Sequence, residues 1–476
     1  MNIVKRKQLN KVLFGLLGPM LLILMVVEAG ASDSDTTLLY QTSCTVNKDD
    51  LNFTGDSLGN VFVSWSNQYD STRRDILLQG IDKNGNRLWP EEGLTVCQSI
   101  GDQYKIRMAP DEEGGVVLVW LDTRDSTKQY PQLYTQRMNR QGNPVWETHG
   151  IPVCDMALNP SSVVLYPSEN GTLCFWKDER NGVSDIFAQV IGSDGRPQWN
   201  LEGVPVCVSC SGTGSYYVID GHNNKWGLTW EDNRDSCVRV YAATIDSKGN
   251  NLWKFNGIPV SSVTATQTGA RMAQGVQGDY FVSWKDERLN HLGDIYAQRM
   301  DSTGNVLWNS GGLTVCNSTN IQEDIGMAED GWGGFYITWE DFRNFTVMPG
   351  EIPIGFWQRM DADGNPYWDE NGIYSPTICT NIMKPDYKGG MLFSGVNDYS
   401  YGIGGYHTHT SAAIRYDRYH NVLSSAVIYT YGAELPMLPD LNTGFYVTQA
   451  YGNMIYLYHF KSNPTSISPV LWKELE

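Results

Sequence analysis

The chain has 476 residues, of which 41% are hydrophobic and 12% aromatic, with 48 Gly and a formal net charge of −18. This composition provides for a large core, and the many Gly and aromatic residues suit short strands and tight turns. The acidic balance disfavours nucleic acid and anionic membrane surfaces as partners.

Residues 1–31 differ from the rest of the chain. A basic start is followed by an apolar run, Val12–Val27, and by an A-x-A pattern that ends at Ala31. This order predicts a signal peptide cleaved before Ser32, and therefore a secreted protein in the periplasm, outside the cell or on the cell surface. The alternative is an uncleaved anchor, but the run is short for a membrane span and contains Pro19. No later segment is apolar enough to span a membrane, and the mature chain carries about −21.

One tryptophan position recurs along the remaining chain at steps of 54 to 56 residues. Its six copies are Trp65, Trp120, Trp176, Trp230, Trp284 and Trp339. Gly395 and Gln449 continue the series, so the chain holds eight units. A period of this length indicates a repeat architecture.

Unit two shows what each repeat builds. Four strand-like runs, each bounded by turn residues, cover Gln103–Pro110, Val116–Trp120, Leu133–Met138 and Gly150–Cys154. No helical period is present. Four short strands in a unit of this size are typical of a β-propeller blade.

The two ends of the chain predict how the ring closes. Trp472 continues unit eight, which stops at Glu476 before its last strand, and Leu38–Cys44 looks like that missing strand. Closure by the N-terminal strand would remove exposed sheet edges. We therefore expect an all-β fold: a single eight-bladed propeller over residues 32–476. A seven-bladed ring is the competing count.

A second tryptophan marks the hairpin after the third strand of six units. Its copies are Trp89, Trp146, Trp199, Trp253, Trp308 and Trp368. Large aromatic side chains at fixed places in every unit suit the wedge-shaped gaps between blades.

These motifs resemble known propeller families. The segments Ile151–Cys154, Trp176–Arg180 and Asp185–Gln189 together resemble a tandem repeat of secreted bacterial propeller proteins. The D-x-x-G-N-x-x-W turn, as in Asp82–Trp89, resembles the Asp-box of sialidases and is similar to the tryptophan-docking motif of eight-bladed quinoprotein dehydrogenases. Both motifs are structural in their families, so the resemblance implies a fold and not a reaction.

Nine cysteines are present, and five of them occupy one repeat position. These are Cys44, Cys97, Cys154, Cys207 and Cys316. Equivalent positions on neighbouring blades lie too far apart for a disulfide, which needs Cα atoms within roughly 7 Å. We therefore predict buried thiols, and we expect no metal or redox role for the isolated C-x-x-C of Cys207 and Cys210.

A W-x-D-x-R motif occurs in five units. Its charged pairs are Asp122/Arg124, Asp178/Arg180, Asp232/Arg234, Asp286/Arg288 and Asp341/Arg343. They could form a ring that binds a glycan or an anionic ligand, but one ligand cannot need five copies. We expect each Asp to cap its loop and each Arg to lie over the adjacent Trp or pair with a carboxylate. The loop joins strands two and three, on the face that propellers use for ligands.

The departures from the repeat are the better candidates for function. Unit six has an enlarged loop, residues 344–353, and unit seven lacks both tryptophans and the W-x-D-x-R charges. The predicted ligand-binding residues are Phe345, Tyr399, Tyr401, Tyr406, His407 and His409. Tyr presents an apolar face and a hydroxyl, which suits binding. Metal ligation by His407 and His409 with a third group, or a blade that has merely drifted, are the alternatives.

We therefore expect a secreted, non-catalytic propeller that binds a polysaccharide or a protein through this loop face. A sialidase-like hydrolase or lyase on the same face, and a purely structural surface protein, are the alternatives. A pair of non-repeating carboxylates beside an arginine outside the W-x-D-x-R set would favour the enzyme. No cofactor is expected. Calcium at Asp361–Glu370 is disfavoured because Pro366 stands where a calcium loop needs Gly.

Overall fold

The computed structural model describes most of the chain between residues 34 and 460. The gaps are residues 42–44, 47–49, 71–72, 112, 156, 209–214, 222, 290, 344–353, 376–377, 386–390, 402–406, 417–421, 431–436, 440–444 and 452–453. The proposed signal peptide and the segment around Trp472 lie outside the described residues.

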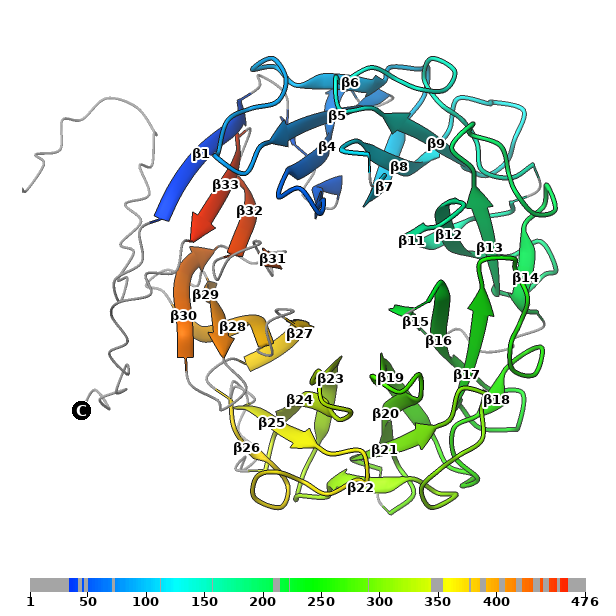
Figure 1. The fold of residues 1–476 in the computed structure, drawn as a ribbon, viewed down its shortest axis with the longest axis vertical. Coiled ribbons are helices and arrows are strands. Elements are labelled where there is room, and N and C mark those ends of the chain that lie inside the picture. Colours follow the sequence, from blue (N-terminus) through cyan, green and yellow to red (C-terminus); the bar gives the residue numbers. More distant parts are fainter. Residues whose placement is uncertain are drawn as a thin grey trace, which may run out of the picture.

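The described residues form eight antiparallel sheets arranged in a ring (Figure 1). The strands nearest the axis include β7, β11, β15, β19, β23, β27 and β31. Consecutive strands pair with one another, so each repeat unit folds as one blade. The predicted all-β propeller and its eight blades are confirmed. We number the blades one to eight in chain order.

In blades one to seven the strands follow one another in sequence. Blade one contains β2 (Thr45–Val46), β3 (Asn52–Gly55), β4 (Val61–Asp70), β5 (Arg73–Ile81) and β6 (Leu94–Cys97). Blades two to four contain β7 (Gln103–Pro110), β8 (Val116–Asp122), β9 (Gln132–Met138), β10 (Ile151–Pro152), β11 (Ser161–Ser168), β12 (Gly171–Asp178), β13 (Asp185–Ile191), β14 (Val204–Cys207), β15 (Tyr216–Gly221), β16 (Lys225–Asp232), β17 (Arg239–Asp246) and β18 (Ile258–Pro259).

The second half of the ring repeats this order. Blades five and six contain β19 (Gln267–Gln274), β20 (Tyr280–Asp286), β21 (Asp294–Met300), β22 (Leu313–Cys316), β23 (Gln322–Glu329), β24 (Phe335–Asp341), β25 (Ile354–Met360) and β26 (Ile373–Tyr374). Blades seven and eight contain β27 (Ile378–Pro385), β28 (Met391–Tyr401), β29 (His407–Tyr416), β30 (Val422–Thr430), β31 (Met437–Pro439), β32 (Phe445–Tyr451), β33 (Met454–Phe460) and β1 (Ser34–Gln41).

The apolar sequence of the second strand follows from its place in the ring. Every residue of β8 is buried, because both faces of the blade pack against neighbouring blades. A strand covered on both faces reads as a continuous apolar run and not as an alternation. This is why Val116–Trp120 lacks the polar residues of a half-exposed strand.

The recurring tryptophan fills the gap between its own blade and the preceding one. Trp120 is fully buried in a cluster that includes Phe62 and Leu78 of blade one. Trp65 of blade one packs with Tyr446 and Leu457 of blade eight. The predicted wedge role is confirmed, and the same contact joins the two ends of the repeat series.

The N-terminal strand closes the ring as predicted. β1 pairs with β33 in antiparallel register, from Ser34 opposite Phe460 to Gln41 opposite Met454. The closing strand thus starts and ends a few residues before the expected Leu38–Cys44. Backbone hydrogen bonds across blade eight join residues more than 400 positions apart in the sequence.

The second tryptophan position docks on the hairpin of the next blade. Trp89 donates its indole N–H to the carbonyl of Arg140 at 3.3 Å. Gly142 in that hairpin has φ +81°, and a Cβ there would lie 2.8 Å from the indole nitrogen of Trp89. Glycine is therefore favoured at this turn for two reasons: the positive φ of its backbone, and the space that Trp89 of the preceding blade occupies.

The cysteine prediction holds in part. Cys97, Cys154 and Cys316 are buried free thiols, and burial raises the pKa of the Cys97 and Cys316 thiols to about 12. The prediction is wrong for Cys207, which is disulfide-bonded. Cys44 and Cys210 lie outside the described residues. In the described part of the chain, no helix is long and apolar enough to cross a membrane.

Candidate functional site

The W-x-D-x-R loops have one geometry in all five copies. In blade five, Asp286 accepts hydrogen bonds from the indole of Trp284 at 2.8 Å and from the backbone N–H of Arg288 at 2.9 Å. The Arg288 guanidinium donates to the same carboxylate at 2.6 Å and to the carbonyl of Gly311 at 2.8 Å. The motif ties the second strand, its loop and the outer strand together.

The arginine of each motif stacks on an aromatic ring of the third strand. The distance from the guanidinium carbon to the ring centroid is 3.7–4.2 Å in the five blades. The rings are Tyr134, Phe187, Tyr241, Tyr296 and Phe356. The expected pairing with Asp is thus observed, but the expected stacking on the motif's own Trp is not. That Trp lies against the same aromatic ring, with centroids 6.1–6.4 Å apart.

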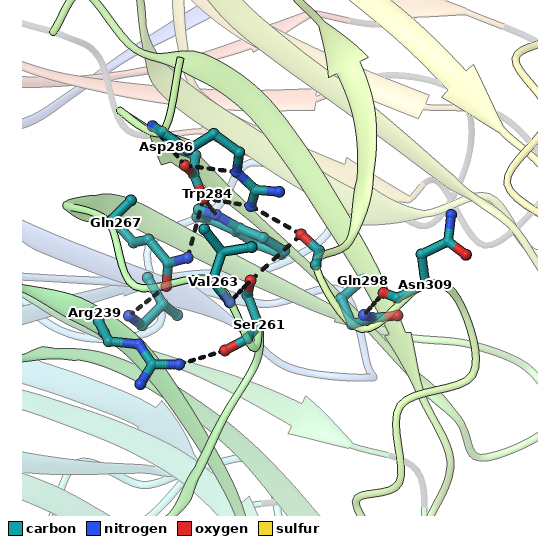
Figure 2. A network of polar contacts seen from close by, with 12 residues as sticks. Arg239, Ser261, Val263, Gln267, Trp284, Asp286, Gln298 and Asn309 are labelled. Atoms are coloured by element: carbon teal, nitrogen blue, oxygen red, sulfur yellow. Dashed lines mark hydrogen bonds and ion pairs between the residues drawn. The ribbon is translucent and has the colours of Figure 1, made fainter. Parts of the chain in front are cut away.

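The motif is linked to the preceding blade and to the core. Gln267, the first residue of β19, donates to the carboxylate of Asp286 at 3.0 Å and accepts from the backbone N–H of Val240 in blade four (Figure 2). Asp286 is fully buried. Burial alone would raise the pKa of Asp286, but hydrogen bonds from Arg288 and Trp284 lower it overall. These charges are engaged in the fold in every copy, so we do not assign them to a ligand.

Blade one lacks the motif and carries a different charge cluster at the same end of the blade. Asp50 lies in the turn between β2 and β3, where it accepts from the hydroxyl of Ser66 at 2.6 Å and from the backbone N–H of Lys105 in blade two. The guanidinium of Arg74 lies 3.7 Å from the carboxylate of Asp50 and 3.2 Å from that of Asp102. We refer to Asp50, Arg74 and Asp102 as the blade-one triad.

The members of the triad differ in accessibility. Asp50 is 1% exposed, whereas Arg74 and Asp102 are 22% and 26% exposed. Arg74 also lies over the ring of Tyr104, 4.9 Å from its centroid. Sequence reasoning missed this cluster. The available signal was the loss of W-x-D-x-R in unit one together with the Arg73-Arg74-Asp75 run at the start of the following strand.

Inner-strand bulges shape the rim near the axis. The registers of β7 and β19 shift between Tyr104 and Arg107 and between Thr268 and Arg271. Lys105 in the first bulge has φ 53°, and its backbone N–H donates a hydrogen bond to the carboxylate of Asp50. Gly269 in the second donates its N–H to Glu231 of the preceding blade at 2.8 Å. Carboxylates from the preceding blade thus satisfy backbone groups that the bulges release from the sheet ladder.

Blade seven carries four of the six predicted ligand-binding residues on one hairpin. In the β28–β29 register, Tyr399 lies opposite His409 and Tyr401 lies opposite His407. Residues two apart along a strand, and residues directly opposite across an antiparallel pair, belong to the same face of the sheet. The backbone therefore brings these four positions together. Tyr406 and Phe345 lie outside the described residues.

Hairpin length separates blades one and seven from the regular blades. In blades two to six, the second strand ends at the Asp of the motif, as β8 does at Asp122. In blade one β4 continues to Asp70, three residues past the equivalent Asn67, and in blade seven β28 continues to Tyr401. These two blades flank blade eight in the ring (Figure 1). Among the described residues, the second strands that extend past the motif position therefore lie on both sides of the seam.

The possible calcium site is a turn in the structure. One oxygen of Asp361 accepts from the backbone N–H groups of Asp363 and Asn365 at 2.9 and 2.8 Å, and the other accepts from the Asn365 side chain at 3.0 Å. Among the described residues, no group of three His, Cys, Asp or Glu side chains is arranged to hold a metal ion. The turn geometry alone explains the residue types at Asp361–Asn365.

Comparison with known proteins gives no family. No protein-family model matches the chain, and no curated protein matches it. Among solved structures, an ulvan lyase described as a new family of polysaccharide lyase shares 10% identity over 79% of this chain and 92% of its own, with a TM-score of 0.45.

Two further solved structures are similar at the same low level. The WD40 domain of SCAP from fission yeast has 11% identity, covers 90% of this chain and 94% of its own, and gives a TM-score of 0.42. An endo-arabinase from Bacteroides thetaiotaomicron has 12% identity, covers 58% and 99%, and gives 0.29. At these values the similarities carry no argument about function.

Proposed function

We propose that the protein is exported and acts as a non-catalytic binding propeller, which takes a polysaccharide or a protein segment at the loop face beside its seam. The observation that carries this proposal is the extension of the β4–β5 and β28–β29 hairpins beyond the regular repeat. Binding residues gather on loops held by a rigid scaffold. Here the scaffold is the set of regular blades, and the extended hairpins are the variable part.

The residue types on the blade-seven hairpin support binding. Tyr399 and Tyr401, opposite His409 and His407, supply aromatic faces with polar tips and few rotatable bonds. Such side chains contact a ligand at a low cost in conformational entropy. The net charge of −18 favours neutral or cationic ligands over acidic ones.

The test is a binding screen with matched variants. The chain from residue 32 onward is applied to arrays of immobilised polysaccharides and of peptides, and affinities for the hits are then measured in solution. Tyr399→Ala and Tyr401→Ala should each weaken binding about tenfold. Tyr130→Ala is the control, because Tyr130 is a partly buried tyrosine in the corresponding loop of the regular blade two. Equal affinities for all four proteins would remove the assigned site.

The blade-one triad favours a second candidate function, a glycan hydrolase or lyase on the same face. It supplies two non-repeating carboxylates beside an arginine outside the W-x-D-x-R set. Both oxygens of Asp50 already accept hydrogen bonds and the side chain is 1% exposed, so Asp102 is the group available for proton transfer. Asp102→Asn should then abolish the release of new chain ends from a bound polysaccharide. A wild-type protein that binds polysaccharides and releases no new ends argues for the first function.

A further inference from the structure

A second candidate site lies on the opposite face of the ring, at blade six. Trp332 stands in the turn between β23 and β24, and Tyr367 stands in the hairpin after β25. They are 43% and 55% exposed, and no other tryptophan in the described residues is exposed to this degree. The other tryptophans of the described residues are buried or partly buried, so Trp332 departs from the pattern of the repeat.

Arg359 joins the two aromatic side chains into one surface. Its guanidinium carbon lies 5.0 Å from the Trp332 ring centroid and 4.1 Å from that of Tyr367. The buried Asp330 holds this arginine through contacts of 2.9 and 2.8 Å. We call Trp332, Tyr367 and Arg359 the aromatic platform.

The platform is fixed in place before any ligand arrives. Asp330 accepts from the backbone N–H of Trp332 at 2.7 Å, and the backbone N–H of Tyr367 donates to the carbonyl of Arg359 at 2.8 Å. Arg359 is 12% exposed and Asp330 1%. A rigid surface loses little conformational entropy on binding, which favours affinity from a small contact area.

Blade two shows that the fold does not require these aromatic residues. It has the same Asp–Arg pair, Asp111 and Arg137, at 2.9 Å. Glu113 stands at the position of Trp332 and contacts Arg137 at 2.6 Å, and Val145 stands at the position of Tyr367. The pair belongs to the repeat, whereas the aromatic residues belong to blade six. The fold therefore does not require aromatic residues at the positions of Trp332 and Tyr367.

The size and charge of the platform identify the class of ligand. A stable protein interface buries about 800 Å² on each partner, which is far more than two partly exposed side chains offer. The charges of Arg359 and Asp330 compensate each other, so the surface provides no net charge for an acidic group. A pyranose ring has an apolar C–H face of the size of one aromatic ring, and hydroxyl groups at its edge.

We infer that the aromatic platform binds a neutral sugar ring by stacking. The site is independent of the loop face proposed above, because the two lie at opposite ends of the strands. If the loop-face ligand is a polysaccharide, the platform gives the protein a second contact on the other side of the ring. If that ligand is a protein, the platform still provides a separate sugar site.

Titration with neutral oligosaccharides tests this inference. Cellohexaose, mannohexaose and xylohexaose are the probes, with saturation-transfer NMR and calorimetry as readouts on the chain from residue 32. At least one probe should bind the wild type, and Trp332→Ala and Tyr367→Ala should each weaken that binding about tenfold. Tyr367→Phe should retain it, because the ring remains.

Two controls keep the outcomes distinct. Tyr374→Ala removes a 63% exposed tyrosine of the same blade outside the platform, and should leave binding unchanged. Tyr401→Ala tests the loop face and should also leave platform binding unchanged. Failure of all three sugars to bind, or unchanged affinity in Trp332→Ala and Tyr367→Ala, overturns the inference. A wild type that dimerises through the platform, with Trp332→Ala monomeric by light scattering and no effect on sugar binding, overturns it as well.

Discussion

In blade three, Asp178 receives the indole N–H of Trp176 and the guanidinium of Arg180, which also reaches the carbonyl of Glu202 in the outer-strand hairpin. In blade one, Trp65 is followed by Ser66 and Asn67 instead. The charges at that end include Arg74, shared between Asp50 and Asp102, and the ion pair of Arg73 with Asp75. The same end of the blade therefore carries the repeated W-x-D-x-R hydrogen bonds in blade three and, among the described residues, a charge network found only in blade one.

The difference shows where function can be sought in a repeat protein. A residue that recurs in five blades with the same partners is explained by the blade itself. Residues that replace it in blades one and seven have no such explanation. These two blades also have the extended hairpins. In blades one and seven, the loss of the W-x-D-x-R residues therefore coincides with a longer second strand.

The largest effect is expected from breaking a repeated network. Asp286→Ala removes the acceptor shared by Trp284, Gln267 and Arg288, and leaves a partly buried guanidinium without its carboxylate. We expect a loss of about 3–5 kcal/mol in the free energy of unfolding, measured by urea denaturation. Asp125→Ala is the control, since that carboxylate lies in an exposed stretch of loop. A loss below about 1 kcal/mol for Asp286→Ala, typical of a surface ion pair, would contradict the structural role.

Two glycines of blade five separate packing from backbone strain. Gly312 has φ +84° and an added Cβ would lie 2.6 Å from Trp284, whereas Gly278 has φ +81° and open space around it. Gly312→Ala should cost about 3 kcal/mol through strain and displacement of the tryptophan. Gly278→Ala should cost about 1 kcal/mol through strain alone. Equal decreases in the melting temperatures of Gly312→Ala and Gly278→Ala would show that Trp284 can be displaced without loss of stability.

Acid should weaken the W-x-D-x-R network of blade five. The pKa of Asp286 is lowered in the fold, below the ordinary value of about 3.9. Its carboxylate therefore stabilises the protein above about pH 4, and this contribution is lost as the pH falls through the folded pKa. The stability gap between wild type and Asp286→Asn should narrow between neutral pH and about pH 2.5. A gap that stays constant in melting curves across this range would contradict the assignment.

The smallest structural effect is expected in blade one. Arg74→Ala leaves Asp50 with its hydrogen bonds from Ser66 and Lys105, and Asp102 is partly exposed. We expect a loss of about 1 kcal/mol in urea denaturation. A loss as large as that of Asp286→Ala would place the blade-one triad among the structural networks and weaken its candidacy for function.

Much of the fold could be predicted from the sequence because the same pattern of short strands, turns and tryptophans recurs in successive units, whereas a single unit would be ambiguous. Six tryptophans at one spacing indicate the blade, and the incomplete unit eight indicates closure by the N-terminal strand. The stacking partner of Arg124 could not be predicted, because the choice between Trp120 and Tyr134 depends on cross-strand register. No residue pattern indicated the bulge at Lys105, whose released N–H donates to the carboxylate of Asp50 in another blade.

The site was predictable only in outline. Loss of the template indicated blade seven, and the register now aligns Tyr401 with His407. The meeting of Asp50, Arg74 and Asp102 was not predictable, since it needs contacts between two blades. The platform had a visible signal, because Trp332 stands where unit two has Glu113, but its exposure depends on the turn in which it lies.

The central claim is that repeated loops hold the ring and departing loops bind the ligand. One experiment measures both properties on two variants: thermal unfolding and ligand affinity of Arg180→Ala in blade three and Tyr401→Ala in blade seven. Arg180→Ala should lower the melting temperature and leave the ligand affinity of the folded protein unchanged. Tyr401→Ala should weaken ligand binding and leave the melting temperature unchanged. Loss of affinity in Arg180→Ala, with unchanged binding in Tyr401→Ala, would contradict the account.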